Sequence, residues 1–248
     1  MPVYLLGHDL VFPPPEAAAP EGIVAVGGDV SPERLVLAYS QGIFPWPVRG
    51  YPLLWFSPDP RFVLDLGAVH VARSLRKSLR RGHYEIRFDT AVDEVIARCA
   101  AASRPGQEGT WITPELERGY RKLSELGYAH SIEAFDGDGA LVGGLYGVAF
   151  GRAFFGESMF SHAPDASKVA FITLLGHLST LGYRFVDCQV HTDHLARFGA
   201  QNWPRARFLA ALREALSHPT ESGRWRPRLT PGEALRHLIE HRASADDT

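Results

Sequence analysis

Two polar side chains, Asp187 and Gln189, stand in a segment that otherwise has the pattern of a buried β-strand. From residue 183 to residue 191 the side chains alternate between the two faces of a strand, so this pair is expected to share one face. Burying a carboxylate beside an amide costs several kcal/mol unless both groups are hydrogen-bonded. The pair therefore predicts either a hydrogen-bonded network that fixes the strand register or a chemical site.

The neighbouring residues offer little to other common catalytic chemistries. Cys188 lies on the opposite strand face between two valines, and we interpret it as a small buried hydrophobic residue rather than a nucleophile. His191 and His194 have a spacing that suits metal ligands on a helix, but they stand where a strand leads into a loop and lack a third ligand, so no metal is predicted. The chain has no Walker loop, no G-x-G-x-x-G, no H-E-x-x-H and no identifiable Ser-His-Asp triad. We therefore expect no cofactor.

A second feature with chemical meaning is a basic segment between Asp65 and Glu85, an interval that contains no acidic residue. Its cations recur at spacings of three and four and so form one face of a predicted helix: Arg73, Arg76, Lys77, Arg80 and Arg81. The face expected to be buried consists of Ala72, Leu75 and Leu79. A solvated basic face usually has acidic partners one turn away, and this one has none. The stripe predicts a phosphate-binding site for a polyanion, with a plain solvated face as the alternative.

Composition fits a soluble globular protein. The chain has 248 residues, 45% of them hydrophobic, which suffices for one large core or one core with a small appended domain. The formal net charge of −2 would argue against a nucleic-acid partner only if charge were evenly spread, and it is not. The apolar runs are short and the N-terminus lacks a basic region followed by a long apolar stretch, so we expect no membrane span and no signal peptide. Two distant cysteines without disulfide or metal spacing fit the reducing cytoplasm.

The chain divides by composition into two predicted domains. Residues 1–62 are rich in Pro, Gly and aromatic residues and predict a small, loop-rich N-terminal domain with little regular structure. One helix is clear there, with Ser31 as its N-cap, Pro32 in its first turn and Gly42 at its end. Residues 63–248 alternate helices and strands and form the second predicted domain.

This second domain predicts an α+β fold. Segments 130–135, 140–150 and 152–160 have the pattern of an antiparallel meander, with a turn at 136–139. A helix then runs from Asp165 to Gly182 before the strand of Asp187. The residues expected on its buried side are Phe171, Leu174, Leu175 and Leu178. This order resembles a GNAT-like acyltransferase domain, with a mainly antiparallel mixed sheet flanked by helices.

The acyl donor of a GNAT-like domain would ordinarily be acyl-CoA, held by a glycine-rich turn at a helix start. The chain has SHAPDASK at that position, which lacks glycine and whose Asp165 would repel a phosphate. Acyl-CoA is therefore a poor candidate. A basic helix for a polyanion beside an acyltransferase-like core suggests an acyl group carried on RNA instead.

Short motifs along most of the chain resemble the leucyl/phenylalanyl-tRNA-protein transferase family. They are GIFPWP (42–47), WFSPDPR (55–61), EGTWIT (108–113), AHSIE (129–133), LVGGLYGV (141–148), FFGESMFS (154–161), ASK (166–168) and DCQV (187–190). The match runs in order from residue 4 to residue 227 and combines unrelated local patterns, so chance does not account for it.

The resemblance implies a reaction and its partners. The expected reaction moves Leu or Phe from aminoacyl-tRNA to a protein whose N-terminal residue is Arg or Lys, which marks that protein for degradation by the N-degron pathway. We expect a cytoplasmic monomer. An aminoacyl ester is already activated, so an amine can attack it without a covalent enzyme intermediate, and catalysis reduces to positioning and proton transfer.

The resemblance also implies roles for individual residues. Asp187 is placed to orient or deprotonate the attacking amine, Gln189 to hydrogen-bond the amine or the ester, and Glu157 joins this polar network. Trp111 is expected to pack on the terminal adenosine. The positions that match the pocket for the transferred side chain are Leu145, Phe154, Met159, Leu174, Leu178 and Val186, with Trp46 as its cover. Thr192, a substrate-binding position, stands where many relatives have Asn, and Leu145 where they have Met.

Two alternatives stay open at the level of sequence. One is a GNAT-like acyltransferase that uses acyl-CoA. The other is a module that binds and sequesters aminoacyl-tRNA without catalysis.

Overall fold

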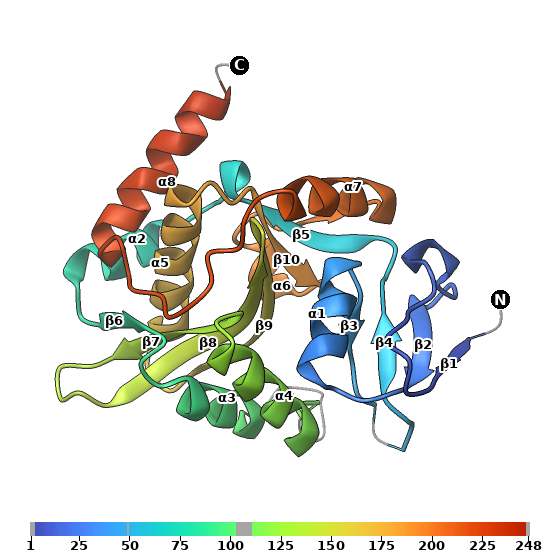
Figure 1. The fold of residues 1–248 in the computed structure, drawn as a ribbon. Coiled ribbons are helices and arrows are strands. Elements are labelled where there is room, and N and C mark those ends of the chain that lie inside the picture. Colours follow the sequence, from blue (N-terminus) through green and yellow to red (C-terminus); the bar gives the residue numbers. More distant parts are fainter. Residues whose placement is uncertain (1–2, 49, 103–110, 247–248) are drawn as a thin grey trace.

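The computed structural model describes residues 3–48, 50–102 and 111–246, which form an α+β fold with two sheets. Figure 1 shows the smaller sheet at one end of the molecule and the larger sheet, with helices on both of its faces, at the other. Of the EGTWIT motif, residues 108–110 lie outside the described part of the chain.

The N-terminal part is a four-stranded sheet of order β1-β2-β4-β3 with one α-helix. Its elements are β1 (Tyr4–Leu6), the 3₁₀ turn η1 (Pro15–Ala17), β2 (Ile23–Gly27), α1 (Pro32–Ser40), β3 (Phe44–Pro45) and β4 (Leu54–Phe56). The Ser31 side chain accepts a hydrogen bond from the Arg34 amide, and Gly42 has a φ of 73°, so both predicted helix boundaries are confirmed. The expected lack of regular structure was wrong, because strands of two to five residues are too short to show a period in the sequence.

The larger sheet has seven strands in the order β11-β5-β10-β9-β8-β7-β6. They are β5 (Arg61–Asp65), β6 (Glu85–Phe88), β7 (Ala129–Phe135), β8 (Leu141–Phe150), β9 (Ala153–Ser161), β10 (Phe185–Gln189) and β11 (Gln201–Trp203). The predicted meander is confirmed as β7-β8-β9, and only the β9-β10 pair is parallel. The boundary predicted at residue 62 falls inside β5, which belongs to this sheet.

Helices cover both faces of the larger sheet (Figure 1). They are α2 (Arg73–Arg81), α3 (Val92–Ala101), α4 (Pro114–Glu125), α5 (Ala166–Thr180), α6 (Asp193–Ala196), α7 (Arg205–Leu216) and α8 (Pro231–Asp246), with a 3₁₀ turn η2 at Leu66–Ala68. Along β8, Leu145 and Ala149 join the core beneath α5, whereas Tyr146 and Val148 join the core beneath α3 and α4. The strand alternation therefore builds two cores, one on each face.

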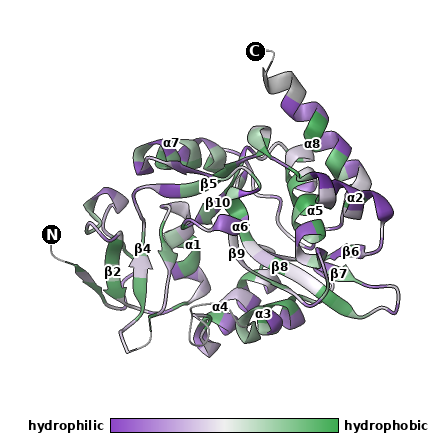
Figure 2. Ribbon diagram, turned by 180° about the vertical axis from the view of Figure 1, so that it is seen from behind, coloured by the Kyte–Doolittle hydropathy of each residue, from purple (hydrophilic) through white to green (hydrophobic). Residues whose placement is uncertain are grey.

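Two predicted helix faces differ from the structure. From Ala166 to Leu178 of α5 every residue except Lys168 is buried, so the helix has no solvent face, because α8 packs on the side away from the sheet. On α2 the buried residues are Leu75 and Leu79, as expected, but Ala72 is exposed because it is the N-cap that precedes the helix. Figure 2 shows the hydropathy of α8 alternating along its length, as suits a helix with one buried side.

Candidate active site

A pocket of about 700 Å³ opens where β9 and β10 separate. The two strands pair in parallel from Phe185 opposite Ala153 to Asp187 opposite Phe155, and β9 then continues to Ser161 beside β8 alone. The pocket is lined by residues 156–161 of β9 and by 188–190 from the end of β10. The site therefore lies in the gap between two neighbouring strands that diverge.

Most of the predicted substrate-binding residues line this pocket. They are Trp46, Trp111, Leu145, Phe154, Met159, Val186 and Thr192, together with Glu157 and Gln189. Leu174 and Leu178 do not; both are fully buried in the core, and α5 lines the pocket with Ser167 and Phe171 instead. Ser167, Phe171, Leu174 and Leu178 follow each other at helical spacing and so lie on one face of α5, but the pocket ends one turn before Leu174.

The pocket is mainly apolar and bears an aromatic pair at one side. The rings of Trp46 and Trp111 stack with centroids 5.3 Å apart and planes inclined by 10°. Trp46 comes from the segment after β3, and Trp111 from the segment before α4. The N-terminal part of the chain therefore contributes to the wall of a pocket in the larger sheet.

Glu157 is the centre of a polar network at the pocket. Its Oε1 accepts hydrogen bonds from the Tyr39 hydroxyl at 2.7 Å and from Gln189 Nε2 at 3.0 Å, and its Oε2 accepts one from the Tyr120 hydroxyl at 2.7 Å. The two tyrosine hydroxyls are themselves 2.9 Å apart. Four elements, α1, α4, β9 and the end of β10, thus converge on one carboxyl group.

This network favours the protonated form of Glu157. The two hydroxyls and the carboxyl group make three oxygen–oxygen contacts, and two tyrosine protons fill only two of them. A proton on the carboxyl group supplies the third hydrogen. Burial raises the pKa of Glu157 to about 7, against the hydrogen bonds from Tyr39 and Tyr120 that lower it, and the nearby charge of Asp187 adds to the rise. A carboxyl group with this pKa can give or take a proton at neutral pH.

Asp187 lies behind the pocket and is engaged in a buried ion pair. Arg61 Nε donates to its Oδ1 at 2.8 Å and Nη2 to its Oδ2 at 2.6 Å, and neither side chain is exposed. Arg61 Nη1 donates to the carbonyl of Gly42 at 3.0 Å, and its guanidinium group lies over the rings of Phe44 and Phe208. Asp187 is not among the residues that line the pocket.

Gln189 reaches the pocket because the strand ends in an unusual backbone conformation. Its φ is 64°, and the register with β5 shifts between Asp187 and Gln189. The Gln189 amide nitrogen donates to Asp187 Oδ1 at 2.9 Å, a contact that holds the turn. The strict alternation of side chains expected from the sequence therefore ends before Gln189. Asp187 holds the backbone of this turn, whereas the Gln189 side chain faces Glu157.

Sequence comparison gives the family. The model of the leucyl/phenylalanyl-tRNA protein transferase family matches residues 63–213, and that of its N-terminal domain matches residues 28–59. The chain belongs to this family. It is therefore an aminoacyltransferase, of a family that moves an aminoacyl group from tRNA to proteins.

Individual relatives cover nearly the whole chain. A leucyl/phenylalanyl-tRNA–protein transferase of Myxococcus xanthus is 59% identical over 91% of this chain and 97% of its own. Another, of Anaeromyxobacter dehalogenans, is 57% identical over 91% of this chain and 96% of its own. The structure of L-PGS from Bacillus licheniformis matches 86% of this chain and 71% of its own, at 11% identity and a TM-score of 0.38.

In this aminoacyltransferase the basic helix α2 stands at the other side of the pocket from the tryptophans. Four of its five stripe residues are exposed and Arg76 is half-buried, with Nε donating to the Val71 carbonyl at 2.8 Å. None of the five forms an ion pair with a carboxylate in the described part of the chain. Ser78 donates to Asp165 at the start of α5, close to Ser167, which lines the pocket. The stripe is therefore available to a polyanion near the pocket.

Three members of the polar network were missed by sequence reasoning. Tyr39 and Tyr120 lie within helices, where a buried tyrosine carries no signal of its partner, and Arg61 stands at the end of a Pro-rich segment. Arg61 alone gave a local signal. Its charge stands directly before the apolar run FVL, and a cation at the start of a buried strand needs a partner, so a buried acidic group could have been expected.

Two features are absent from the described residues, a metal-binding cluster and a membrane-spanning helix. Residues 3–48, 50–102 and 111–246 contain no group of three or more His, Cys, Asp and Glu side chains arranged to hold a metal ion. Over the same ranges, no helix combines the length and apolar character needed to cross a membrane. Cys188 lines the pocket but is buried, and burial raises the pKa of its thiol, which suits the predicted inert role.

Proposed function

We propose that this enzyme transfers Leu or Phe from aminoacyl-tRNA to the α-amino group of proteins that begin with Arg or Lys, and so marks them for the N-degron pathway. The observation that carries the proposal is an apolar pocket with a carboxyl group of pKa about 7 at its wall. The pocket suits a large apolar side chain, and the carboxyl group suits an amine that must lose a proton. We expect the enzyme to act as a monomer in the cytoplasm.

The order of elements supports a GNAT-like assignment for the larger sheet. A meander of β7, β8 and β9 leads through α5 to β10, which runs parallel to β9. The substrate pocket lies where these two strands diverge. In the proposed reaction this gap holds the ester between the strand ends.

The transfer needs one bond formed, one broken and one proton moved. The acceptor nitrogen attacks the ester carbonyl carbon, the C–N bond forms, and the ester C–O bond breaks. The nitrogen loses a proton and the ribose oxygen gains one. The ester supplies the driving force, so the enzyme has only to position the partners and manage these protons.

Glu157 is the proposed group for proton transfer. An α-amino group has a pKa of about 7.7 to 8.0, close to that of Glu157, so a proton can pass between them with little cost. Gln189 cannot take a proton, but its amide can hydrogen-bond the amine or the ester while it holds Glu157. Tyr39 and Tyr120 can stabilise the carboxylate when the proton has left.

Asp187 is the proposed positioning residue for this arrangement. Its carboxylate is fully buried, accepts hydrogen bonds from Arg61 and from the Gln189 backbone amide, and does not line the pocket that would hold a substrate amine. The same contacts hold Gln189 in its left-handed conformation. Of the two roles implied by the family resemblance, orientation through Gln189 is therefore the one that the geometry supports.

The remaining proposed contacts divide between the two ends of the tRNA substrate. The transferred side chain enters among Leu145, Phe154, Met159 and Val186, with the terminal adenosine on Trp111 and Thr192 nearby. The backbone phosphates of the tRNA bind the stripe on α2.

A transfer assay with purified protein tests the proposal. Labelled Leu-tRNA, Phe-tRNA or an acyl-CoA is incubated with a peptide that begins with Arg, and with the same peptide beginning with Gly as the control. We expect label in the Arg peptide from both charged tRNAs and none from acyl-CoA. Transfer from acyl-CoA would indicate the GNAT-like alternative, and binding of charged tRNA without transfer would indicate a sequestering module.

A further inference from the structure

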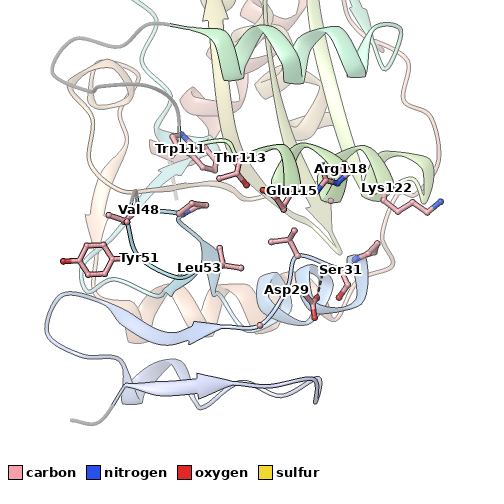
Figure 3. Close-up of a pocket in the computed structure, with 16 residues that line it drawn as sticks. Asp29, Ser31, Val48, Tyr51, Leu53, Trp111, Thr113, Glu115, Arg118 and Lys122 are labelled. Carbon is pink, nitrogen blue, oxygen red and sulfur yellow. Dashed lines mark hydrogen bonds and ion pairs between the residues drawn. The ribbon is translucent and has the colours of Figure 1, made fainter.

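A second hollow, of about 910 Å³, adjoins the active-site pocket but belongs to none of the assigned contacts. It is a groove between the N-terminal sheet and α4. Figure 3 shows Trp111, Thr113 and Glu115 on one wall and Val48, Tyr51 and Leu53 across from them. Trp111 lines both this groove and the active-site pocket, so the two hollows share one wall.

The described residues that line the groove combine apolar side chains with two acidic and two basic ones. Tyr51 is 69% exposed and Val48 38%, both unusually open for apolar residues, and Leu53 lies beside them. Among the described residues that line the groove, the two cations are already paired on α4, Arg118 with Glu115 at 3.1 Å and Lys122 with Glu125 at 2.6 Å. A groove of this kind does not attract a polyanion.

The basic stripe lies on a different side of the molecule. Helix α2 packs on α5 and α8, and Figure 1 shows these helices at the end opposite the N-terminal sheet. The active-site pocket lies between, with Ser167 of α5 on the side toward α2 and Trp111 on the side toward the groove. An RNA bound to α2 therefore approaches the pocket from the side away from the groove, and only its terminal adenosine, proposed to pack on Trp111, reaches the wall that the two hollows share.

We propose that this groove binds the acceptor polypeptide, in extended form, over the residues that follow its basic N-terminal residue. The inference rests on the proposed function and names the binding surface of its second substrate. Apolar side chains of the acceptor pack on Tyr51 and Leu53. The Glu115 carboxylate, which is exposed and forms an ion pair with the exposed Arg118, exchanges that arginine for a cation or backbone amide of the acceptor.

The test compares two acceptors, an Arg-Ala dipeptide amide and a ten-residue peptide that begins with Arg-Ala, at saturating Leu-tRNA. The variants are Tyr51→Ala and Glu115→Gln. Each has a matched control outside the groove: Tyr4→Ala, where the tyrosine is 49% exposed, and Glu94→Gln, an exposed α3 carboxylate paired with Arg98 as Glu115 is paired with Arg118. All four positions are exposed, so folding is not at issue.

We expect each groove variant to raise the KM for the long peptide by about tenfold while the KM for the dipeptide, the KM for Leu-tRNA and kcat stay unchanged. The controls should behave like wild type. Unchanged long-peptide KM values in both groove variants would overturn the inference, and so would a raised KM for Leu-tRNA, since the groove would then bind RNA. Failure of wild type to modify either peptide would instead refute the proposed function, so the two failures are distinguishable.

Discussion

At the scale of single residues, Glu157 is where burial and hydrogen bonding produce a group suited to proton transfer. Replacing it by Gln keeps the size and most of the hydrogen bonds of the side chain but removes its acid–base chemistry. We expect the kcat of Glu157→Gln for peptide modification to fall about a hundredfold or more with little change in affinity for aminoacyl-tRNA. Single-turnover transfer and a tRNA binding titration measure the two quantities.

The pH dependence of the same variant distinguishes proton transfer from a structural role. Because the base must be unprotonated, titration of Glu157 should add to the wild-type rate profile a limb that rises with pH up to about 7, the pKa of this group. The variant should lose this limb. Titration of the acceptor amine affects wild type and variant equally. A pH–rate profile of Glu157→Gln that matches wild type would therefore rule out Glu157 as the base.

The pocket residues allow a test of donor choice. Met159 lines the pocket and is half-buried, so Met159→Ala should enlarge it and raise the ratio of Phe to Leu transfer, since the larger donor gains most from extra space. Leu178→Ala is the control, because Leu178 is fully buried but outside the pocket. It should cost about 2 to 5 kcal/mol of stability and leave the ratio unchanged. Competition between charged Leu- and Phe-tRNA measures the ratio of Phe to Leu transfer. A change of this ratio in Leu178→Ala but not in Met159→Ala would show that the donor side chain binds deeper along α5.

At the scale of elements, the pairing of β10 with β5 depends on the ion pair of Asp187 and Arg61. Asp187→Ala leaves the Arg61 charge buried without a partner, which costs about 3 to 5 kcal/mol. Turnover should also fall much further than tRNA affinity, because Gln189 loses the acceptor that holds its backbone. Urea unfolding and transfer assays give both results.

A double variant, Arg61→Met with Asp187→Leu, separates stability from positioning. Replacing both ions by apolar groups should recover much of the stability, since a buried ion pair gains little over good packing. Transfer should remain low. If turnover returned with stability, Asp187 would serve the fold alone.

Helix α2 gives the second prediction at this scale. Lys77→Ala with Arg80→Ala should weaken the binding of any tRNA and lower the slope of log K against log salt by roughly 0.7 to 0.9 for each lost phosphate contact. The exposed pair Arg213→Ala with Arg226→Ala removes the same charge elsewhere and should leave the slope nearly unchanged. Filter binding over a range of salt concentrations gives the slopes. Equal slopes in the two double variants would show that the stripe is only solvated.

At the scale of the whole molecule, two buried carboxyl groups link stability to pH. Burial raises the pKa of both Glu157 and Glu133 from 4.5 to about 7. Between these values the folded state holds protons that the unfolded state releases, so this contribution is complete below pH 4.5 and is lost as pH rises through about 7. From pH 5 to pH 8 these two groups should therefore lower the free energy of unfolding, and this loss should be smaller in Glu157→Gln and Glu133→Gln; the buried His177, whose pKa burial lowers to about 4, acts in the opposite direction in all three proteins. Urea unfolding at pH 5 and pH 8 measures the change in the free energy of unfolding. Equal changes in wild type and both variants would contradict the raised pKa values of Glu157 and Glu133.

Much of the fold was predictable because its signals are local. The cap at Ser31, the meander from β7 to β9 and the stripe on α2 depend on residues within a few positions of one another. The motif set reached further and identified the family, since eight local patterns together carry information that no single pattern has. Short strands such as β3 and β11 escaped because two or three residues define no period.

The sequence by itself thus determined the longer helices and strands, the basic helix and most of the pocket lining, because each depends on local spacing or on a motif. The tertiary structure alone decided which groups meet. Arg61 and Asp187 are 126 positions apart and Tyr39 and Glu157 are 118 apart, and no spacing rule joins them. It also decided that the pocket ends at Phe171 rather than Leu174, and that Glu157 rather than Asp187 faces the pocket. The pKa of a carboxyl group depends on what surrounds it in three dimensions, so only the folded chain could set it.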